Sequence, residues 1–186
     1  MRVLGIDPGS RYLGYGLVEW RGRAAAHVTS GVLKAEASQP LHRRLLRLSN
    51  QLQAVFELYQ PDAVAVEGVF THKNARSALI LGHARCVPLL LAAQAGLEVY
   101  EYAPSRVKKS VGAGGGDSKD SVARMVARLL SLPNDFQRAD VSDALAVALC
   151  HVHSLRMPRA STSGARRGAA DSFLARLKPS VVRAAS

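Results

Sequence analysis

The chain has 186 residues, of which 48% are hydrophobic, and a formal net charge of +11. This length supports one packed core, or one core followed by a tail. The sequence has no run of eighteen apolar residues and no signal-peptide pattern at its start, so we expect a soluble, cytoplasmic protein without membrane association. Cys86 and Cys150 lie in apolar helical patterns, which favours two reduced core thiols over a disulfide framework or a zinc site.

The basic excess is divided unevenly along the chain. Residues 157–186 hold six Lys or Arg against one acid, whereas residues 1–156 hold 19 against 13. An excess of this sign and size favours polyanionic partners through counterion release. We predict a folded domain over residues 1–155 and a basic, mostly disordered tail over residues 156–186, because the tail is rich in Ala, Ser, Gly and Arg. The tail serves either as a solubilising extension or as an auxiliary nucleic-acid contact.

Strand patterns come first along the chain. Residues 2–7, 12–20 and 27–35 are short β-type runs separated by Gly-rich or Arg-Gly turns, a spacing typical of antiparallel pairing. Residues 40–59 repeat apolar positions at three- and four-residue steps, which predicts an amphipathic helix. A fourth, apolar strand is predicted over residues 63–66, directly before Glu67.

Helix and strand then alternate. The patterns predict a helix over about residues 75–95, a strand in "LEVYEYAP", a short helix near Arg106, a loop "GAGGGD", and helices over about 118–130 and 140–153. Pro88 lies inside the first of these helices and predicts a kink or break, because an interior proline removes a backbone hydrogen bond. The order of elements indicates an α/β fold, with a mixed sheet flanked by helices.

Four carboxylates end or begin these elements. Asp7 and Glu67 follow apolar strands, while Asp140 and Asp143 share one face at the start of the last helix. Asp140 and Asp143 border a predicted buried stripe of that helix. The stripe consists of Val141, Ala144, Leu145, Ala148, Leu149 and Val152. Three of the acids also have a simpler explanation: Asp7 suits a tight turn, Asp140 suits an N-cap, and Asp140 and Asp143 in a first turn complement the helix dipole.

The four acids would converge if the last helix packed across the strand ends, where open α/β sheets usually bind ligands. Four neighbouring carboxylates repel one another, and hard divalent cations relieve that repulsion. Paired ions of this kind are a recurring device for phosphoryl displacement. With the basic charge of the chain, this predicts a metal-dependent reaction on nucleic acid.

The segments "GIDPGSRYLGYG", "AVEGVF", "VKKSV" and "ADVSDALAVAL" resemble, in order and spacing, the bacterial Holliday junction resolvase family RuvC over roughly residues 1–155. The resemblance implies a ribonuclease H-like fold with a five-stranded sheet of three antiparallel and then two parallel strands. It also implies a homodimeric, Mg²⁺-dependent endodeoxyribonuclease that nicks four-way DNA junctions symmetrically in recombination and repair. A branch-migration motor complex is the implied partner.

The same resemblance implies roles for single residues. Asp7, Glu67, Asp140 and Asp143 match the metal-binding acids, which we expect to hold two Mg²⁺ ions per site, with Mn²⁺ able to substitute. In the family, the dimer forms through the second helix, so Pro88 also bears on the interface.

Further matches concern DNA. Phe70 matches an aromatic that packs against bases near the junction centre, and Lys108 and Lys119 match lysines near the DNA backbone or the scissile phosphate. Lys119 is informative without the resemblance, since a cation in a helix's first turn opposes the dipole unless a phosphate is present. The alternatives are a core aromatic at Phe70 and ordinary surface lysines.

Three further residues, Lys73, Arg76 and Lys109, are also expected to contact DNA. The loop "GAGGGDSK" lacks the GxxxxGK[ST] arrangement, so we expect it to be a mobile loop facing DNA rather than a nucleotide cradle. His151 and His153 have no third partner at a suitable spacing; we place them outside the metal site and assign them to the helix dipole.

Other functions share parts of this pattern. The sugar kinase, actin and heat-shock ATPase superfamily opens on a similar strand and turn, but it needs two such domains and this chain has room for one. A non-catalytic module that binds structured nucleic acid need not keep four acids. A nuclease of the same fold that cuts RNA–DNA hybrids is the nearest enzymatic alternative, and it would act on duplexes as a monomer.

Overall fold

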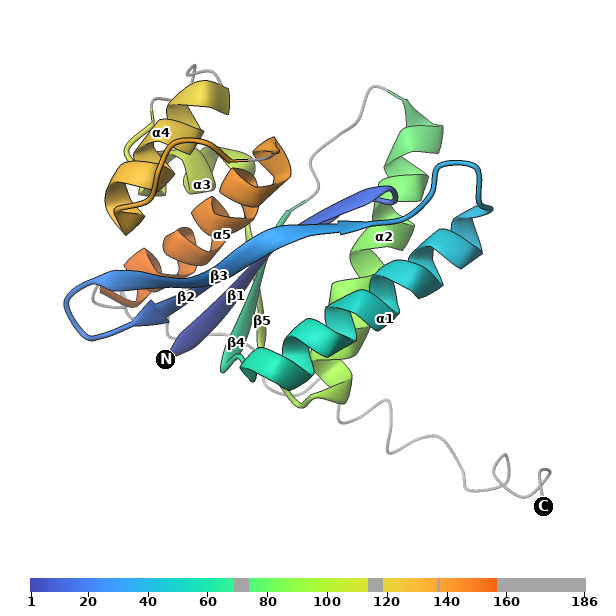
Figure 1. The fold of residues 1–186 in the computed structure, drawn as a ribbon, viewed down its shortest axis with the longest axis horizontal. Coiled ribbons are helices and arrows are strands. Elements are labelled where there is room, and N and C mark those ends of the chain that lie inside the picture. Colours follow the sequence, from blue (N-terminus) through green and yellow to red (C-terminus); the bar gives the residue numbers. More distant parts are fainter. Residues whose placement is uncertain (69–73, 114–118, 137, 157–186) are drawn as a thin grey trace, which may run out of the picture. The chain divides into compact units, whose positions relative to one another are not determined.

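A computed structural model describes residues 1–68, 74–113, 119–136 and 138–156 of the chain. Its strands form one sheet in the order β3-β2-β1-β4-β5 (Figure 1). The bounds are Arg2–Asp7 for β1, Tyr12–Trp20 for β2, Ala25–Lys34 for β3, Ala63–Glu67 for β4 and Val99–Tyr102 for β5. β1, β2 and β3 pair antiparallel, whereas β4 pairs parallel with both β1 and β5. The predicted α/β class and mixed sheet are therefore confirmed.

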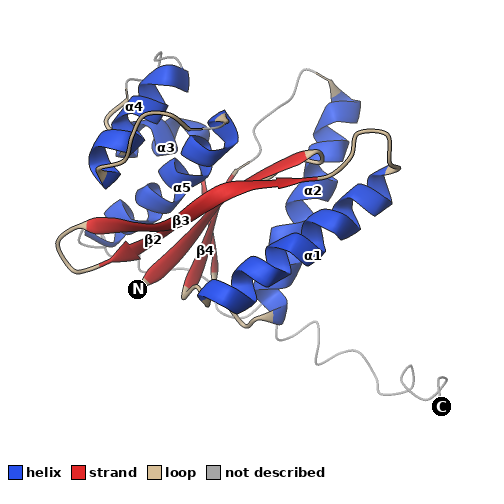
Figure 2. Ribbon diagram, in the orientation of Figure 1, coloured by secondary structure: helices blue, strands red, loops and turns tan. Residues whose placement is uncertain are grey.

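Helices cover both faces of this sheet (Figure 2). α1 (Leu41–Tyr59) and α2 (Ala75–Gln94) lie on one face; α3 (Pro104–Ser110), α4 (Lys119–Leu130) and α5 (Ala139–Arg156) lie on the other. Side chains of β1 alternate between the two cores: Leu4 and Ile6 belong to the core under α1 and α2, and Val3 to the core under α5. The predicted tail lies outside the described residues, apart from Arg156 at the end of α5.

α5 is more deeply buried than its predicted stripe implied. All six stripe residues are buried, as expected, but so are residues on its other sides, including Ala146, Cys150 and His151. α3 and α4 pack against the side of α5 that faces away from the sheet (Figure 1). The helix is therefore an interior element with its first turn at one end of the sheet.

Three local predictions need correction. α2 continues through Pro88, which is buried, so the predicted break is wrong; a kink stays a prediction. Cys86 is exposed, and only Cys150 is a core thiol, whose pKa is raised by burial. Asp140 is the second residue of α5 and not its N-cap, because the helix begins at Ala139.

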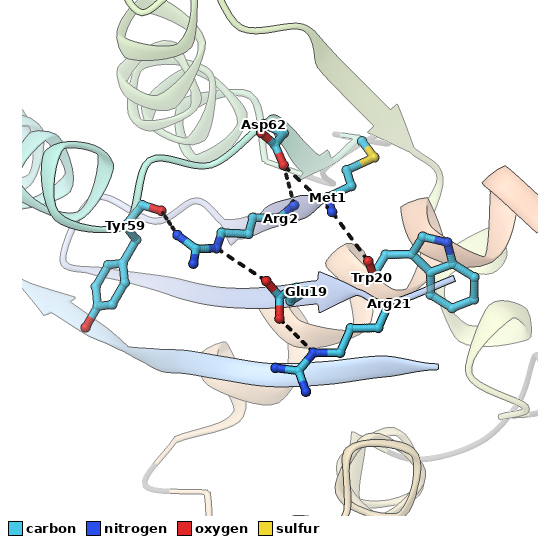
Figure 3. Close-up of polar contacts among 7 residues, drawn as sticks. All are labelled: Met1, Arg2, Glu19, Trp20, Arg21, Tyr59 and Asp62. Atoms are coloured by element: carbon cyan, nitrogen blue, oxygen red, sulfur yellow. Dashed lines mark hydrogen bonds and ion pairs between the residues drawn. The ribbon is translucent and has the colours of Figure 1, made fainter. Parts of the chain in front are cut away.

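A polar network fixes the amino end of β1, as Figure 3 shows. The backbone N–H of Arg2 donates to Asp62 Oδ2 at 2.6 Å, and the guanidinium of Arg2 donates to the Tyr59 carbonyl at 3.2 Å. Glu19 accepts from Arg21 at 2.8 Å, and this hydrogen bond, together with the charge of Arg21, lowers the pKa of Glu19. Arg2 Nε also lies 3.7 Å from Glu19 Oε1, so the network ties β1 to β2 and to the chain that enters β4, at the end of the sheet opposite Asp7.

A second network ties β5 to α5. His151 Nδ1 lies 2.7 Å from the Tyr102 hydroxyl, which lies 3.1 Å from Ser154 Oγ; Ser154 in turn donates to the His151 carbonyl at 2.7 Å. Since the Ser154 proton is used there, the Tyr102 proton goes to Ser154 and His151 donates through Nδ1. The lone pair on Nε2 then lies buried, with no hydrogen-bond partner among the residues that the structure describes. Burial lowers the pKa of His151, so the proposed contribution of this residue to the helix dipole is wrong.

This burial predicts a pH dependence of stability. Unfolding returns the His151 pKa to its ordinary value of 6.5, so below that pH the unfolded chain binds more protons than the folded chain. The free energy of unfolding should therefore fall as pH drops through 6.5, and the denaturant midpoint measures it. His151→Gln should flatten this slope. His42→Gln, at an exposed position of α1, is the control; a wild-type slope in His151→Gln would contradict the assignment.

Candidate active site

β1 and β4 place two carboxylates side by side. In the parallel register, Ile6 is opposite Val66, and adjacent strands lie about 4.8 Å apart. Asp7 and Glu67 are the next residue on each strand, and both side chains are half-buried. Side chains alternate along a strand, so both acids lie on the face that carries Val3 and α5. The predicted meeting of these two acids at the carboxyl ends of the strands is supported by this register.

The first turn of α5 reaches the same place because glycines let it approach. Gly14 of β2 is the register partner of Asp7. A Cβ added to Gly14 would overlap the carbonyl oxygen of Asp140 and lie 3.0 Å from the Asp140 Cβ. A Cβ on Gly5 would likewise overlap the carbonyl oxygen of Ala144, the residue after Asp143. The backbone therefore brings all four predicted acids to one end and one face of the sheet.

The side chain of Asp140 is held by a neighbour that the sequence analysis did not single out. Arg138 Nε donates to Asp140 Oδ2 at 2.7 Å, and the Arg138 guanidinium lies 3.7 Å from the centre of the Tyr12 ring. Within the described part of the chain, no three His, Cys, Asp or Glu side chains are grouped closely enough to hold a metal ion. The backbone thus brings the carboxylates to the same end of the sheet, but their side chains are not grouped around a common point.

The other predicted site residues fall into two groups. Lys108 is partly buried in the last turn of α3, and Lys109 and Arg76 are exposed. α3 begins two residues after Tyr102, which is the register partner of Glu67. Both lysines therefore lie on a short helix that starts close to this acid. Phe70 and Lys73 lie outside the described residues; so does the side chain of Lys119, whose backbone begins α4.

Three features described by the structure were not predicted from the sequence, although two of them have a signal there. The glycines in "GYG" mark a close backbone approach, but a strand glycine equally marks a bulge or bend. Arg138 precedes Asp140 by two residues, a spacing that does not by itself predict a contact inside a helix start. Asn74, whose side chain accepts from the N–H groups of Arg76 and Ser77 at 2.9 and 3.3 Å, is a recognisable N-cap of α2.

Comparison with known proteins identifies the family. The profile of the family described as crossover junction endodeoxyribonuclease RuvC matches residues 3–151. The chain belongs to this family. It is 57% identical to the RuvC of Myxococcus xanthus, covering 98% of each chain, and 47% identical to that of Pelobacter propionicus, covering 88% of this chain and 92% of the relative.

A solved structure agrees with this assignment. The structure of Thermus thermophilus RuvC in complex with Holliday junction substrate has a TM-score of 0.77 and 34% sequence identity, and the match covers 84% of this chain and 96% of that one. The resemblance drawn from the four sequence segments is confirmed, and so is the ribonuclease H-like sheet. RuvC nucleases depend on divalent metal ions, which matches the oxygen-rich donor set described above.

The close contact at Gly14 gives a test of the geometry. Gly14→Ala should lower the free energy of unfolding by about 1–3 kcal/mol through overpacking, and it should lower nuclease activity further by displacing Asp140. Denaturant titration and single-turnover DNA cleavage measure the two effects. Gly82→Ala is the stability control, because a Cβ at Gly82 meets nothing within 4 Å inside α2. Wild-type cleavage by a folded Gly14→Ala protein would show that this contact does not position Asp140.

Proposed function

We propose that this protein is a structure-selective DNA endonuclease that resolves four-way (Holliday) junctions by paired, symmetric nicks in homologous recombination and DNA repair. One observation carries the proposal: the β1–β4 register and the contact of α5 with Gly14 bring four acids to one end of a RuvC fold. The T. thermophilus relative was solved with a Holliday junction substrate, which supports the substrate class. A silent binding module would not need these four acids.

The donor set suits Mg²⁺, with Mn²⁺ as a substitute, and we assign two ions per site. Asp7, Glu67, Asp140 and Asp143 would hold them, since hard divalent ions prefer carboxylate oxygens. When bound, the ions supply Lewis-acid activation and neutralise charge at the phosphate. Arg138 and the Tyr12 ring orient the Asp140 carboxylate, which limits its rotation at the site.

DNA contact falls to the basic residues and one aromatic. Lys119 would meet the scissile phosphate from the start of α4, and Lys108 would meet the backbone nearby. Lys73, Arg76 and Lys109 would add phosphate contacts, and Phe70 would pack on bases at the junction centre. The exposed positions of Arg76 and Lys109 are compatible with these roles.

A homodimer through α2 completes the proposal. Leu79, His83, Cys86 and Leu90 are exposed at three- and four-residue steps and so share one face of α2, whereas Val87 on the other side is buried. Leu79 and Leu90 are 66% and 62% exposed. An exposed apolar helix face of this kind marks a protein contact.

α2 also passes a test of length and composition for a membrane span, with a mean hydropathy of 1.3. The packing of α2 against the sheet and the membership of the chain in a DNA-cutting family favour a protein partner over a membrane. A cytoplasmic location and work beside a branch-migration motor complex complete the proposal; for the motor complex, the support is the family resemblance alone.

Substrate choice is tested first. Labelled four-way junction, matched duplex and RNA–DNA hybrid are each incubated with the protein and Mg²⁺ or Mn²⁺. We expect paired cuts in the junction and little cutting of the other two. Preferential cutting of the hybrid would support the alternative nuclease, and binding without cutting would support the silent module.

Asp7→Asn separates binding from chemistry. An amide oxygen is a poorer ligand for a hard cation than a carboxylate, so single-turnover cleavage should fall about a thousandfold or more. Junction binding should persist or tighten, because the change removes a negative charge that faces phosphate. Asp62→Asn, at the opposite end of the sheet, is the matched control. If Asp7→Asn cuts at nearly the wild-type rate, Asp7 is a turn residue only.

Leu90→Glu tests the dimer. A buried carboxylate on the α2 face should dissociate the dimer, so sedimentation should show a monomer at concentrations where the wild-type protein is dimeric. Paired nicks should become uncoupled single nicks. Leu58→Glu, at a 72% exposed position on α1, is the control. A Leu90→Glu protein that stays dimeric and cuts in pairs would exclude this interface.

A further inference from the structure

A cavity of about 430 Å³ lies beside the proposed active site, between α4 and the start of α5. Its lining includes Asp120, Arg124, Asn134 and Phe136, together with Ala139 and Ser142 of α5. None of these residues has a role in the metal site or in the predicted DNA contacts. The volume is within the range of small-molecule sites and exceeds what a single water needs.

The cavity is next to the reacting centre. Ala139 and Ser142 immediately precede Asp140 and Asp143 on α5, so the cavity face and the acid face of that helix are neighbours. On α4, Asp120 follows Lys119, the residue assigned to the scissile phosphate. A nucleotide next to the cleaved bond would therefore have this cavity within reach.

The chemistry of the lining favours a nucleobase over a phosphate. Asp120 presents a carboxylate, which repels phosphate but accepts hydrogen bonds from the amino groups of bases. Arg124 and Asn134 supply donors and an acceptor, and Arg and Asn side chains pair with the edges of guanine and adenine. Phe136 is a partly buried ring on which a base can stack.

The polar groups of the lining are accessible to a ligand. Asp120, Arg124 and Asn134 are exposed, whereas Ser142 is 1% exposed and donates to the Ala139 carbonyl at 2.9 Å. Arg124 Nη2 donates to Ser121 Oγ at 3.2 Å, which occupies one of the five donors of a guanidinium. The floor of the cavity is thus formed by α5, and the exposed side chains of Asp120, Arg124 and Asn134 lie at its rim.

We propose that this cavity receives the base of a nucleotide beside the scissile phosphate and sets the sequence preference of cleavage. The inference rests on the proposed junction-cutting function and adds a specificity site to it. Extruding a base costs a few kcal/mol, and least where pairing is already disrupted, as at the centre of a junction. Junction structure and local sequence would then be read together, because only an unpaired base of the right kind fills the cavity.

The test uses four-way junctions that differ only in the base pairs flanking one fixed scissile phosphate. Single-turnover cleavage rates with Mg²⁺ give the ratio between the fastest and slowest sequences, and titrations give the junction Kd. Arg124→Ala and Asn134→Ala should each lower that ratio at one flanking position by about tenfold or more. Arg128→Ala removes the same charge from an exposed site on α4 outside the cavity, and it should leave the ratio unchanged.

The outcomes separate this inference from the proposed function. A wild-type protein that cuts with a sequence preference, kept by both cavity variants, overturns the cavity assignment alone. Equal cutting of every junction by the wild-type protein, or an equal loss of preference in Arg128→Ala, also overturns it. A wild-type protein that cuts no junction overturns the proposed function and the cavity assignment together.

Discussion

The close approach of α5 to the sheet is the constraint on which the site depends. Gly5, Gly14 and Gly16 remove the Cβ atoms that would otherwise separate the helix backbone from β1 and β2. A helix normally packs on a sheet through interdigitated side chains, which hold the two backbones apart. Here carbonyl oxygens of α5 lie directly over strand glycines, so short carboxylates from strand ends and from a helix can share one space.

This contact explains why the acids lie beside a hydrophobic core but are only partly buried. α5 is covered on its far side by α3 and α4, so its first turn is fixed by packing rather than by an exposed amphipathic face. Asp140 then depends on Arg138, which is itself held against the Tyr12 ring. The like charges gathered there are tolerated because they lie at the end of the sheet, only partly buried, and because a cation can share them.

The sequence predicted the sheet and the acids because both are local signals: apolar runs, turn residues and carboxylates at element ends. What it could not predict depends on distant neighbours. Whether Gly14 marks a bulge or touches a helix, and whether His151 is a dipole partner or a buried donor to Tyr102, follow from packing between segments far apart in the chain. Pro88 shows the same limit, since the surrounding core keeps α2 continuous where local sterics alone favour a break.

The two faces of the sheet carry different features of the protein. One face carries α5 and the acids; the other carries α2, whose outward side is apolar. β4 links them, because Glu67 ends this strand and α2 is the next element of the chain. Two copies joined through α2 would therefore hold their acid sites at a separation set by a strand and a helix rather than by mobile side chains. A fixed separation is what a two-fold symmetric junction requires if both nicks are to fall on equivalent strands.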